Sequence, residues 1–243
     1  MYSNGLNQPP DDLEASTIYV WDASLSVPQP ELDRYESWLS ADERDRARRF
    51  HFDIHRYRFT AGRGMLRDLL GRYTSREPRE IEFYYETNGK PGLRDCGLHF
   101  NVSHSEDRAA FTFTRVAPVG ADVERVRPLP ELMQIAERFF SPLEFQALSA
   151  LPEAERTPAF FRCWTRKEAI IKTTGEGLSC PLDEFDVSLD ATAQVVAMKA
   201  PAGKYDLFVY DLGLVDGYIG AVACERPCDR IALLPYGILP GRC

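Results

Sequence analysis

The sequence contains no apolar run that approaches the roughly 18 residues of a membrane-spanning helix, and it begins without the short apolar segment of a secretory signal. None of its six cysteines forms a CxxC pair, and no Cys/His cluster has zinc-finger spacing. These absences argue against a membrane partner, a secreted protein and a structural zinc site. We therefore expect a reduced, cytoplasmic protein whose cysteines are core residues or surface bystanders.

The sequence also lacks the excess of positive charge that favours wholesale binding to nucleic acid, because its formal net charge is −8. Nucleic acid is therefore not an expected partner. One segment departs from this balance: residues 44–72 hold nine arginines and only three acids. Such a segment is either the solvated face of a helix or a phosphate-binding surface, since the planar arginine side chain fits phosphate oxygens.

Length and composition indicate one large domain or two packed subdomains, because 44% of the 243 residues are hydrophobic and 27% are charged. Two stretches, LHFNVSHSEDRAAFTF and YDLFVYDLGLVDGYIGAV, share a pattern of strand, short polar loop and strand. Each ends a half that begins with a strand followed by helices, so we expect an internal duplication joined near residues 115–119. Helices and antiparallel strand pairs within each half predict an α+β fold.

Local patterns predict the elements and their limits. One helix is expected after Ser40, which has Glu43 three residues on in a capping-box pattern, and another over about 54–73. The segment FNVSHS is expected in a polar loop between two strands. Strands are expected at residues 16–23, 81–86, 183–190, 193–199, 204–212 and 217–225. We expect a loose tail at 1–16, an N-terminal half at 17–116, a C-terminal half with a metal site at 117–226, and a second tail at 227–243.

Two carboxylates stand close together in the segment GADVE. Asp122 and Glu124 leave the same face of a predicted strand, while Val123 points the other way, into the core. Adjacent carboxylates repel each other unless a cation lies between them, and Mg²⁺ prefers such oxygen ligands. The alternative is a pair of solvent-facing acids on an edge strand.

A predicted helix in FFRCWTRKEAIIKTTGEG carries Thr165, Glu168 and Lys172 on one stripe. An exposed Glu–Lys pair would contribute only about 0.3–0.5 kcal/mol. The surrounding aromatic residues instead favour a half-buried helix, where unpaired charges are costly. In FNVSHS, His104 lies between two serines, but no GxSxG elbow supports nucleophilic catalysis, so a phosphate site fits better.

The order NGKP, FNVSHS, GADVE and WTRKEAIIK resembles the 4′-phosphopantetheinyl transferase superfamily, specifically its Sfp-type members. These carry N-x-S-H-S, G-x-D-x-E and W-x-x-K-E-x-x-x-K segments in the same order, and the resemblance covers about residues 17–224. It implies two similar α/β subdomains related by pseudo-twofold symmetry, each with a small antiparallel sheet packed on helices. It also implies Mg²⁺-dependent transfer of the phosphopantetheine arm of coenzyme A to a serine of an apo acyl or peptidyl carrier protein, releasing 3′,5′-ADP.

The resemblance further implies roles for single residues. Asp122, Glu124 and Glu168 match the positions that hold Mg²⁺. Glu168 also matches the carboxylate proposed to deprotonate the carrier serine, and Asp122 and Lys172 complete the expected catalytic set. Contacts with coenzyme A are implied at Arg63, Lys90, Ser103, His104, Lys167 and Lys172. Arg166 is left without a role.

Two other functions use the same features. The carboxylates could serve a metal-dependent hydrolase of coenzyme A or a related nucleotide, or the chain could be a non-catalytic module that binds coenzyme A. For a transferase, carrier proteins of this class tend to be acidic, so residues 44–49 are a candidate docking patch. One chain that holds both halves is expected to act as a monomer.

Overall fold

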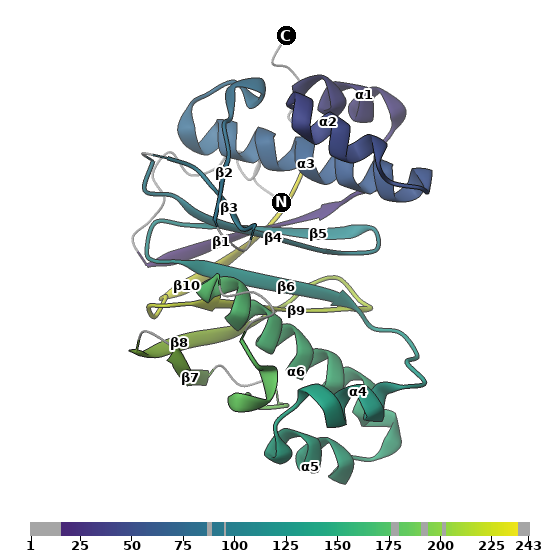
Figure 1. The fold of residues 1–243 in the computed structure, drawn as a ribbon, viewed down its shortest axis with the longest axis vertical. Helices are drawn as coiled ribbons and strands as arrows, with labels where there is room; N and C mark the ends of the chain where they lie inside the picture. The colour runs from purple at the N-terminus through teal and green to yellow at the C-terminus, as the bar shows by residue number, and fades with distance from the viewer. Residues whose placement is uncertain are drawn as a thin grey trace, which may run out of the picture.

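The computed structural model describes residues 16–86, 89–94, 96–175, 180–190, 194–200 and 203–237. The described chain forms four layers, with helices on the two outer sides and two four-stranded sheets between them (Figure 1). The predicted α+β class is confirmed. Within the described residues, no helix is both long enough and apolar enough to span a membrane.

The first sheet has the strand order β10 (Arg230–Pro235), β1 (Thr17–Ser24), β5 (Arg108–Thr114) and β4 (His99–Ser105), and helix α3 (Asp53–Thr74) packs on its outer face. The core between them is built from large side chains such as Trp21, Met65, Leu69 and Phe111, all almost fully buried. The N-terminal half supplies β1 (Thr17–Ser24), α1 (Gln29–Trp38), α2 (Ala41–Arg48), α3 (Asp53–Thr74), η1 (Pro78–Glu80), β2 (Tyr84–Tyr85), β3 (Pro91–Gly92), β4 (His99–Ser105) and β5 (Arg108–Thr114).

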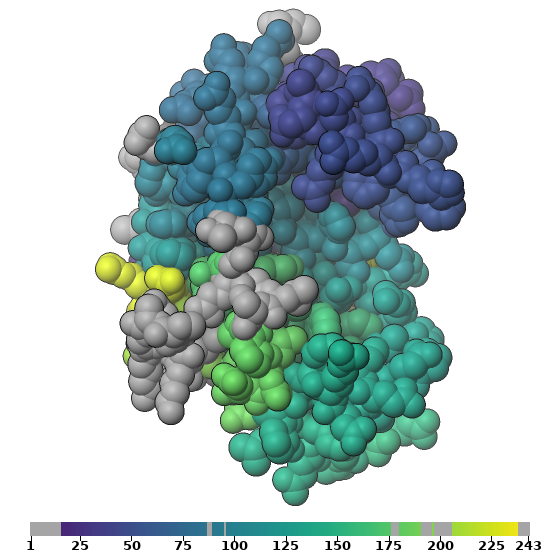
Figure 2. Space-filling view, in the orientation of Figure 1, coloured from purple at the N-terminus to yellow at the C-terminus, as the bar shows by residue number. Residues whose placement is uncertain are grey.

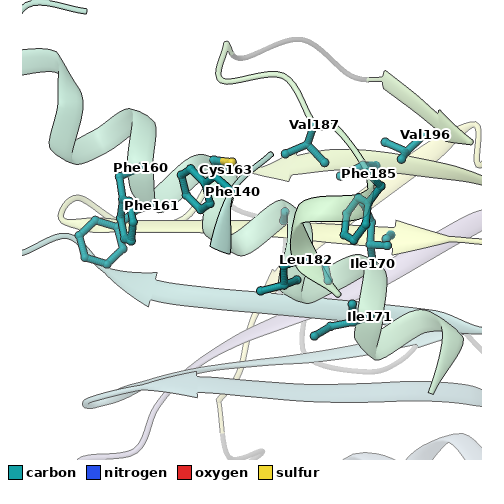
Figure 3. Close-up of a cluster of buried hydrophobic side chains, with 14 of the residues drawn as sticks. Phe140, Phe160, Phe161, Cys163, Ile170, Ile171, Leu182, Phe185, Val187 and Val196 are labelled. Carbon is teal, nitrogen blue, oxygen red and sulfur yellow. The ribbon is translucent and has the colours of Figure 1, made fainter. Parts of the chain in front are cut away.

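The second sheet has the order β6-β9-β8-β7, and the long helix α6 packs on it. Figure 3 shows the aromatic and aliphatic side chains of this core, among them Phe160, Ile170 and Phe185. The C-terminal half supplies β6 (Val119–Arg125), α4 (Leu132–Phe139), α5 (Pro142–Ala150), α6 (Glu153–Thr174), η3 (Leu182–Glu184), β7 (Gln194–Ala200), β8 (Gly203–Leu212), β9 (Tyr218–Cys224) and β10 (Arg230–Pro235).

A third apolar cluster joins the two sheets. Ile18 and Val20 of β1 meet Ala121 and Val123 of β6 there, all nearly inaccessible to solvent. The inward direction predicted for Val123 is therefore confirmed. In the space-filling view, the purple and blue residues of the N-terminal half gather at one end of the molecule, and the teal-green and green residues of the C-terminal half gather at the other (Figure 2).

Several predicted elements are confirmed. The capping box at Ser40 opens α2, with the Ser40 amide donating to Oε2 of Glu43 at 2.9 Å. Helix α3 covers the predicted 54–73 segment, and β7, β8 and β9 match the strands predicted at 193–199, 204–212 and 217–225. The boundary expected near residue 116 stays a prediction; β5 ends at Thr114 and β6 begins at Val119.

Other predictions are wrong. FNVSHS lies entirely within β4, because its buried polar side chains bond to β6 instead of facing solvent. Residues 183–190 form no strand, since Phe185 and Val187 are buried without pairing to a sheet. Only Tyr84–Tyr85 of the 81–86 segment is a strand.

The second tail, expected at 227–243, is also corrected. Residues Arg230–Pro235 form β10, which pairs in parallel with β1 and adds a strand to the N-terminal sheet. Its proline and its neighbouring glycines hid the strand pattern. Residues 1–15 and 238–243, which include most of the first expected tail, lie outside the described residues.

Candidate functional site

A cavity of about 380 Å³ opens where β4, β6 and α6 meet. Six of the predicted site residues line it, together with two apolar side chains. The lining residues are Val102, Ser103, His104, Asp122, Glu124, Trp164, Glu168 and Lys172. A larger cavity of about 690 Å³ lies beside α5, α6 and residues 186–190, but none of the predicted site residues lines it. The smaller cavity is therefore the candidate site.

Gly120 allows α6 to lie directly against β6. A Cβ atom at this position would stand 2.2 Å from the carbonyl oxygen of Ala169 and 2.4 Å from the amide nitrogen of Thr173. Both atoms belong to the helix backbone and cannot move without shifting the helix. Alternate residues of a strand share one face, so Asp122 and Glu124 meet the same side of α6.

Asp122 and Lys172 form the centre of the site. The Lys172 ammonium donates to Oδ1 of Asp122 at 2.6 Å, and the Ser103 hydroxyl donates to the same oxygen at 2.8 Å. Asp122 is buried, and among the described residues its second oxygen, Oδ2, has no hydrogen-bond partner. A buried carboxylate oxygen without a partner is costly, so this atom is poised to accept a ligand.

Glu124 and Glu168 both have raised pKa values. Burial is the main cause for Glu168; Lys172 opposes the rise, and the charges of Asp122 and Glu124 add to it. Burial also raises the pKa of Glu124 most, while the Ser105 hydrogen bond opposes the rise and Asp122 adds to it. Three neighbouring acids around one ammonium leave the cavity richer in negative charge, which favours a bound cation.

Sequence patterns did not reveal two residues of β4 that contact β6 beside the cavity, Asn101 and Ser105. The Ser105 hydroxyl donates to Oε2 of Glu124 at 2.6 Å, and Asn101 Oδ1 accepts from the amide of Ala121 at 3.0 Å. With Ser103 they occupy alternate positions of β4. The N-x-S-x-S spacing was visible in the sequence, but only as part of an expected loop.

Lys90 links the two halves at the end of α6. Its ammonium donates to the carbonyl oxygens of Lys172 at 2.7 Å, Thr173 at 3.2 Å and Val119 at 3.3 Å. Burial lowers the pKa of Lys90, against the opposing effects of Glu86 and Glu225. In this structure the ammonium thus satisfies carbonyls at the C-terminus of α6, which no helical amide can reach, and does not line the cavity.

The structure does not bring Lys167 to the cavity, and this expectation is corrected. Its side chain is 0% exposed, donates to the carbonyls of Leu182 and Phe185 at 2.6 Å each, and pairs with Glu144 at 2.8 Å. The physical reason is helical geometry, because successive residues point about 100° apart. Glu168 therefore faces β6, while Lys167 points into the core beside Glu144 and Phe185.

Arg63 also lies away from the cavity. Its guanidinium pairs with Glu43 at 2.5 Å, donates to the Tyr85 hydroxyl at 2.6 Å and lies over the ring of Phe83. Arg166, which had no assigned role, makes two hydrogen bonds of 2.8 Å to Asp211 and is 1% exposed. Its charge therefore ties α6 to β8.

The donor set of the cavity fits a divalent cation. In the part of the chain that the structure describes, no three acidic, histidine or cysteine side chains already converge on one point. Asp122, Glu124 and Glu168 nevertheless line one cavity, and Oδ2 of Asp122 is buried without a partner. Carboxylate oxygens are the ligands that hard divalent cations prefer.

Comparison with known proteins identifies the family of the chain. The model of the 4′-phosphopantetheinyl transferase superfamily matches residues 118–223, and that of the 4′-phosphopantetheinyl transferase N-terminal region matches residues 24–113. The 4′-phosphopantetheinyl transferase HetI of Nostoc sp. (strain PCC 7120) is 40% identical over 223 residues, covering 90% of this chain and 92% of the relative. The 4′-phosphopantetheinyl transferase Sfp of Bacillus subtilis (strain 168) is 34% identical over 211 residues, covering 86% and 91%. The chain therefore belongs to the 4′-phosphopantetheinyl transferase superfamily.

Proposed function

We propose that this protein is a 4′-phosphopantetheinyl transferase that moves the phosphopantetheine arm of coenzyme A to a serine of an apo acyl or peptidyl carrier protein. The observation that carries the proposal is the cavity itself, in which the carboxylates of Asp122, Glu124 and Glu168 surround the Lys172 ammonium. The relatives' names support the same reaction. Phosphoryl-type transfer needs positioning and charge neutralisation more than a covalent nucleophile.

The groups in the cavity suit the pyrophosphate of coenzyme A. Lys172 presents a cation that is partly exposed, and His104 is exposed at the same opening. Ser103 lies between them. An ammonium, an imidazole and a hydroxyl can together neutralise and orient phosphate oxygens. We expect Lys90 and Arg63 to act on coenzyme A only if their present carbonyl and Glu43 contacts are exchanged on binding.

Glu168 is the proposed general base. A carboxylate with a raised pKa is a better proton acceptor, provided it is ionised at the working pH. It would take the proton of the carrier serine as that oxygen forms a bond to the phosphorus on the pantetheine side. The bond from this phosphorus to the bridging oxygen then breaks, and 3′,5′-ADP leaves with the electron pair.

We propose that Asp122, Glu124 and Glu168 also hold Mg²⁺, and the unpartnered Oδ2 of Asp122 supports this assignment. When bound, the ion would supply positive charge against the pyrophosphate oxygens. Since Lys172 already occupies Oδ1 of Asp122, the second oxygen is the one left for the ion.

The proposal also includes the surface that binds the carrier, the oligomeric state and the cellular location. Helix α2 and its C-cap, Arg49, carry the basic segment of residues 44–49, which we expect to dock an acidic carrier. Charge reversal there should raise the KM for the carrier and leave the KM for coenzyme A unchanged. Both sheets and the cavity come from one chain, so we propose a monomer that acts in the cytoplasm.

Release of 3′,5′-ADP tests the reaction against its alternatives. Coenzyme A and Mg²⁺ are incubated with the protein, with and without an apo carrier. A transferase releases 3′,5′-ADP only when the carrier is present. Release without a carrier would instead indicate a hydrolase, and tight binding of coenzyme A with no release across a panel of carriers would indicate a binding module.

A further inference from the structure

Strands β4 and β6 are edge strands of the two sheets and lie beside each other (Figure 1). Side chains of β4 join them, and the described residues form no backbone ladder between them. Three alternate residues of β4 accept hydrogen bonds from three alternate amides of β6. The pairs are Asn101 with Ala121 at 3.0 Å, Ser103 with Val123 at 3.2 Å, and Ser105 with Arg125 at 3.1 Å. We call these three contacts the β4–β6 seam.

The two serines of the seam make a second contact, and it is the same in both. Each hydroxyl accepts from one amide of β6 and donates its proton to the carboxylate one residue earlier on β6. Ser103 donates to Oδ1 of Asp122 at 2.8 Å, and Ser105 donates to Oε2 of Glu124 at 2.6 Å. A hydroxyl has one proton to donate and accepts through its oxygen lone pairs. Because each serine oxygen accepts from a β6 amide, its proton is directed toward the neighbouring carboxylate.

From this repeated geometry we infer that Ser103 and Ser105 are positioning residues, each of which holds one oxygen of a carboxylate and thereby presents the other oxygen to the cavity. The inference deepens the proposed function and rests on it, because the presented oxygens matter only if the cavity binds a cation or coenzyme A. The contacts of Asp122 support this inference: Ser103 and Lys172 hold Oδ1, and Oδ2 is buried without a partner among the described residues.

Positioning matters because the carboxylates and the hydroxyls come from opposite halves of the protein. A free Glu side chain loses rotamer entropy when it is ordered, and the Ser105 hydrogen bond makes that ordering part of the folded state. Contacts behind ligand residues of this kind alter metal affinity or activity by about 10- to 100-fold when removed. The β4–β6 seam therefore links the packing of β4 on β6 to the positions of the carboxylate oxygens that would bind a cation.

Asn101 provides a matched control within the same seam. Its Oδ1 accepts from a β6 amide at a distance similar to those of the serines. The preceding β6 residue, however, is Gly120, which has no side chain to position. Removing the Asn101 side chain thus breaks one seam contact without touching a carboxylate. Ser105 is the sharper test residue than Ser103, since Ser103 also accepts from Lys172 at 3.2 Å.

The experiment compares Ser105→Ala, Ser105→Thr and Asn101→Ala with the unaltered protein. Mn²⁺ alone is the probe, and its binding is followed by electron paramagnetic resonance of the free ion. Thermal unfolding of each variant measures the structural cost of the lost seam contact. Steady-state transfer to a carrier then gives kcat and the KM for coenzyme A.

We expect Ser105→Ala to bind Mn²⁺ about 10- to 100-fold more weakly, Ser105→Thr to recover most of this loss, and Asn101→Ala to stay within about twofold of the unaltered protein at a similar loss of thermal stability. Equal Mn²⁺ affinity in Ser105→Ala and Asn101→Ala would overturn the inference, as would an unaltered protein that binds no Mn²⁺. Failure of the proposed function looks different: Mn²⁺ affinities follow the expected order, but no carrier is modified.

Discussion

Lys172 donates its ammonium to Oδ1 of Asp122 at 2.6 Å, which ties the last turns of α6 to the middle of β6. The Lys172 side chain is still 29% exposed, whereas that of Asp122 is 6% exposed. One member of the pair thus faces the cavity opening, and the other is held beneath it. A partly exposed cation above a buried carboxylate can meet an anionic substrate without leaving its partner.

Replacing Lys172 tests whether its positive charge contributes to transfer. We expect Lys172→Met to lower kcat/KM for transfer by about 10²- to 10³-fold, the loss typical of removing one preorganised electrostatic contact. Lys172→Arg should retain part of the rate, because it keeps the charge. Initial rates over a range of coenzyme A concentrations, at saturating Mg²⁺ and carrier, give kcat/KM for coenzyme A, and circular dichroism is the control for folding. A Lys172→Met rate within twofold of the unaltered protein would refute this role.

Glu168 should show opposite effects on activity and stability. Its pKa in the folded protein lies above the ordinary value of 4.5. Between these two values the folded state binds more protons than the unfolded state, so stability falls as pH rises. Glu168→Gln removes this cost, and we expect it to raise the Tm at pH 7 in metal-free buffer. The gain should shrink as the pH falls toward 4.5.

The same Glu168→Gln variant should lose about 10²- to 10⁴-fold in transfer rate, since a neutral amide cannot accept the serine proton. Differential scanning calorimetry at several pH values and a rate assay on one preparation measure both effects. A lower Tm at pH 7 would show that the charged carboxylate stabilises the fold, contrary to the pKa direction.

Lys90 should contribute to stability through the end of α6. Lys90→Met leaves the carbonyl oxygens of Lys172 and Thr173 without their ammonium donor, and a buried acceptor left unsatisfied costs about 1–3 kcal/mol. Urea denaturation gives the change in the free energy of unfolding. Arg79→Met, at an exposed position of η1, is the control and should stay within about 0.5 kcal/mol. Equal stability of the two variants would contradict the capping role.

Lys167 should matter for folding and not for coenzyme A. Removing one partner of a buried ion pair typically costs about 3–5 kcal/mol, and Lys167→Met leaves Glu144 without its cation. The folded fraction should keep the KM for coenzyme A of the unaltered protein. Denaturation and steady-state kinetics at low temperature separate the two effects. An unchanged free energy of unfolding together with a raised KM for coenzyme A would show that Lys167 acts in the substrate site.

Sequence alone could predict the parts of the site that depend on local periodicity. The spacing of Asp122 and Glu124 on a strand, and of Glu168 and Lys172 on a helix, gave four residues that line one cavity. The prediction for Lys167 was wrong for a reason found in the same helix. Its positive charge and its position next to Glu168 suggested a contact with coenzyme A, but successive helical residues point about 100° apart, so its side chain lies in the core.

The residues that sequence reasoning misplaced depend on contacts distant in the chain. Asn101, Ser103 and Ser105 looked like a polar loop, because their hydrogen-bond partners lie about 20 positions later on β6. Lys90 meets carbonyls of α6 that are 82 and 83 positions away. Strand β10 returns from the end of the chain to pair with β1. No local sequence pattern specifies which strand or helix end will contact a given residue in the folded protein.

The most direct test of phosphopantetheine transfer is the intact mass of an apo carrier protein after incubation with this protein, coenzyme A and Mg²⁺. We expect a gain of one phosphopantetheine arm per carrier, lost when the carrier serine is replaced by alanine and lost with Asp122→Asn of the enzyme. An unchanged carrier mass across acyl and peptidyl carriers, with the enzyme folded, would refute the transferase function. An undiminished gain with Asp122→Asn would contradict the proposed role of Asp122.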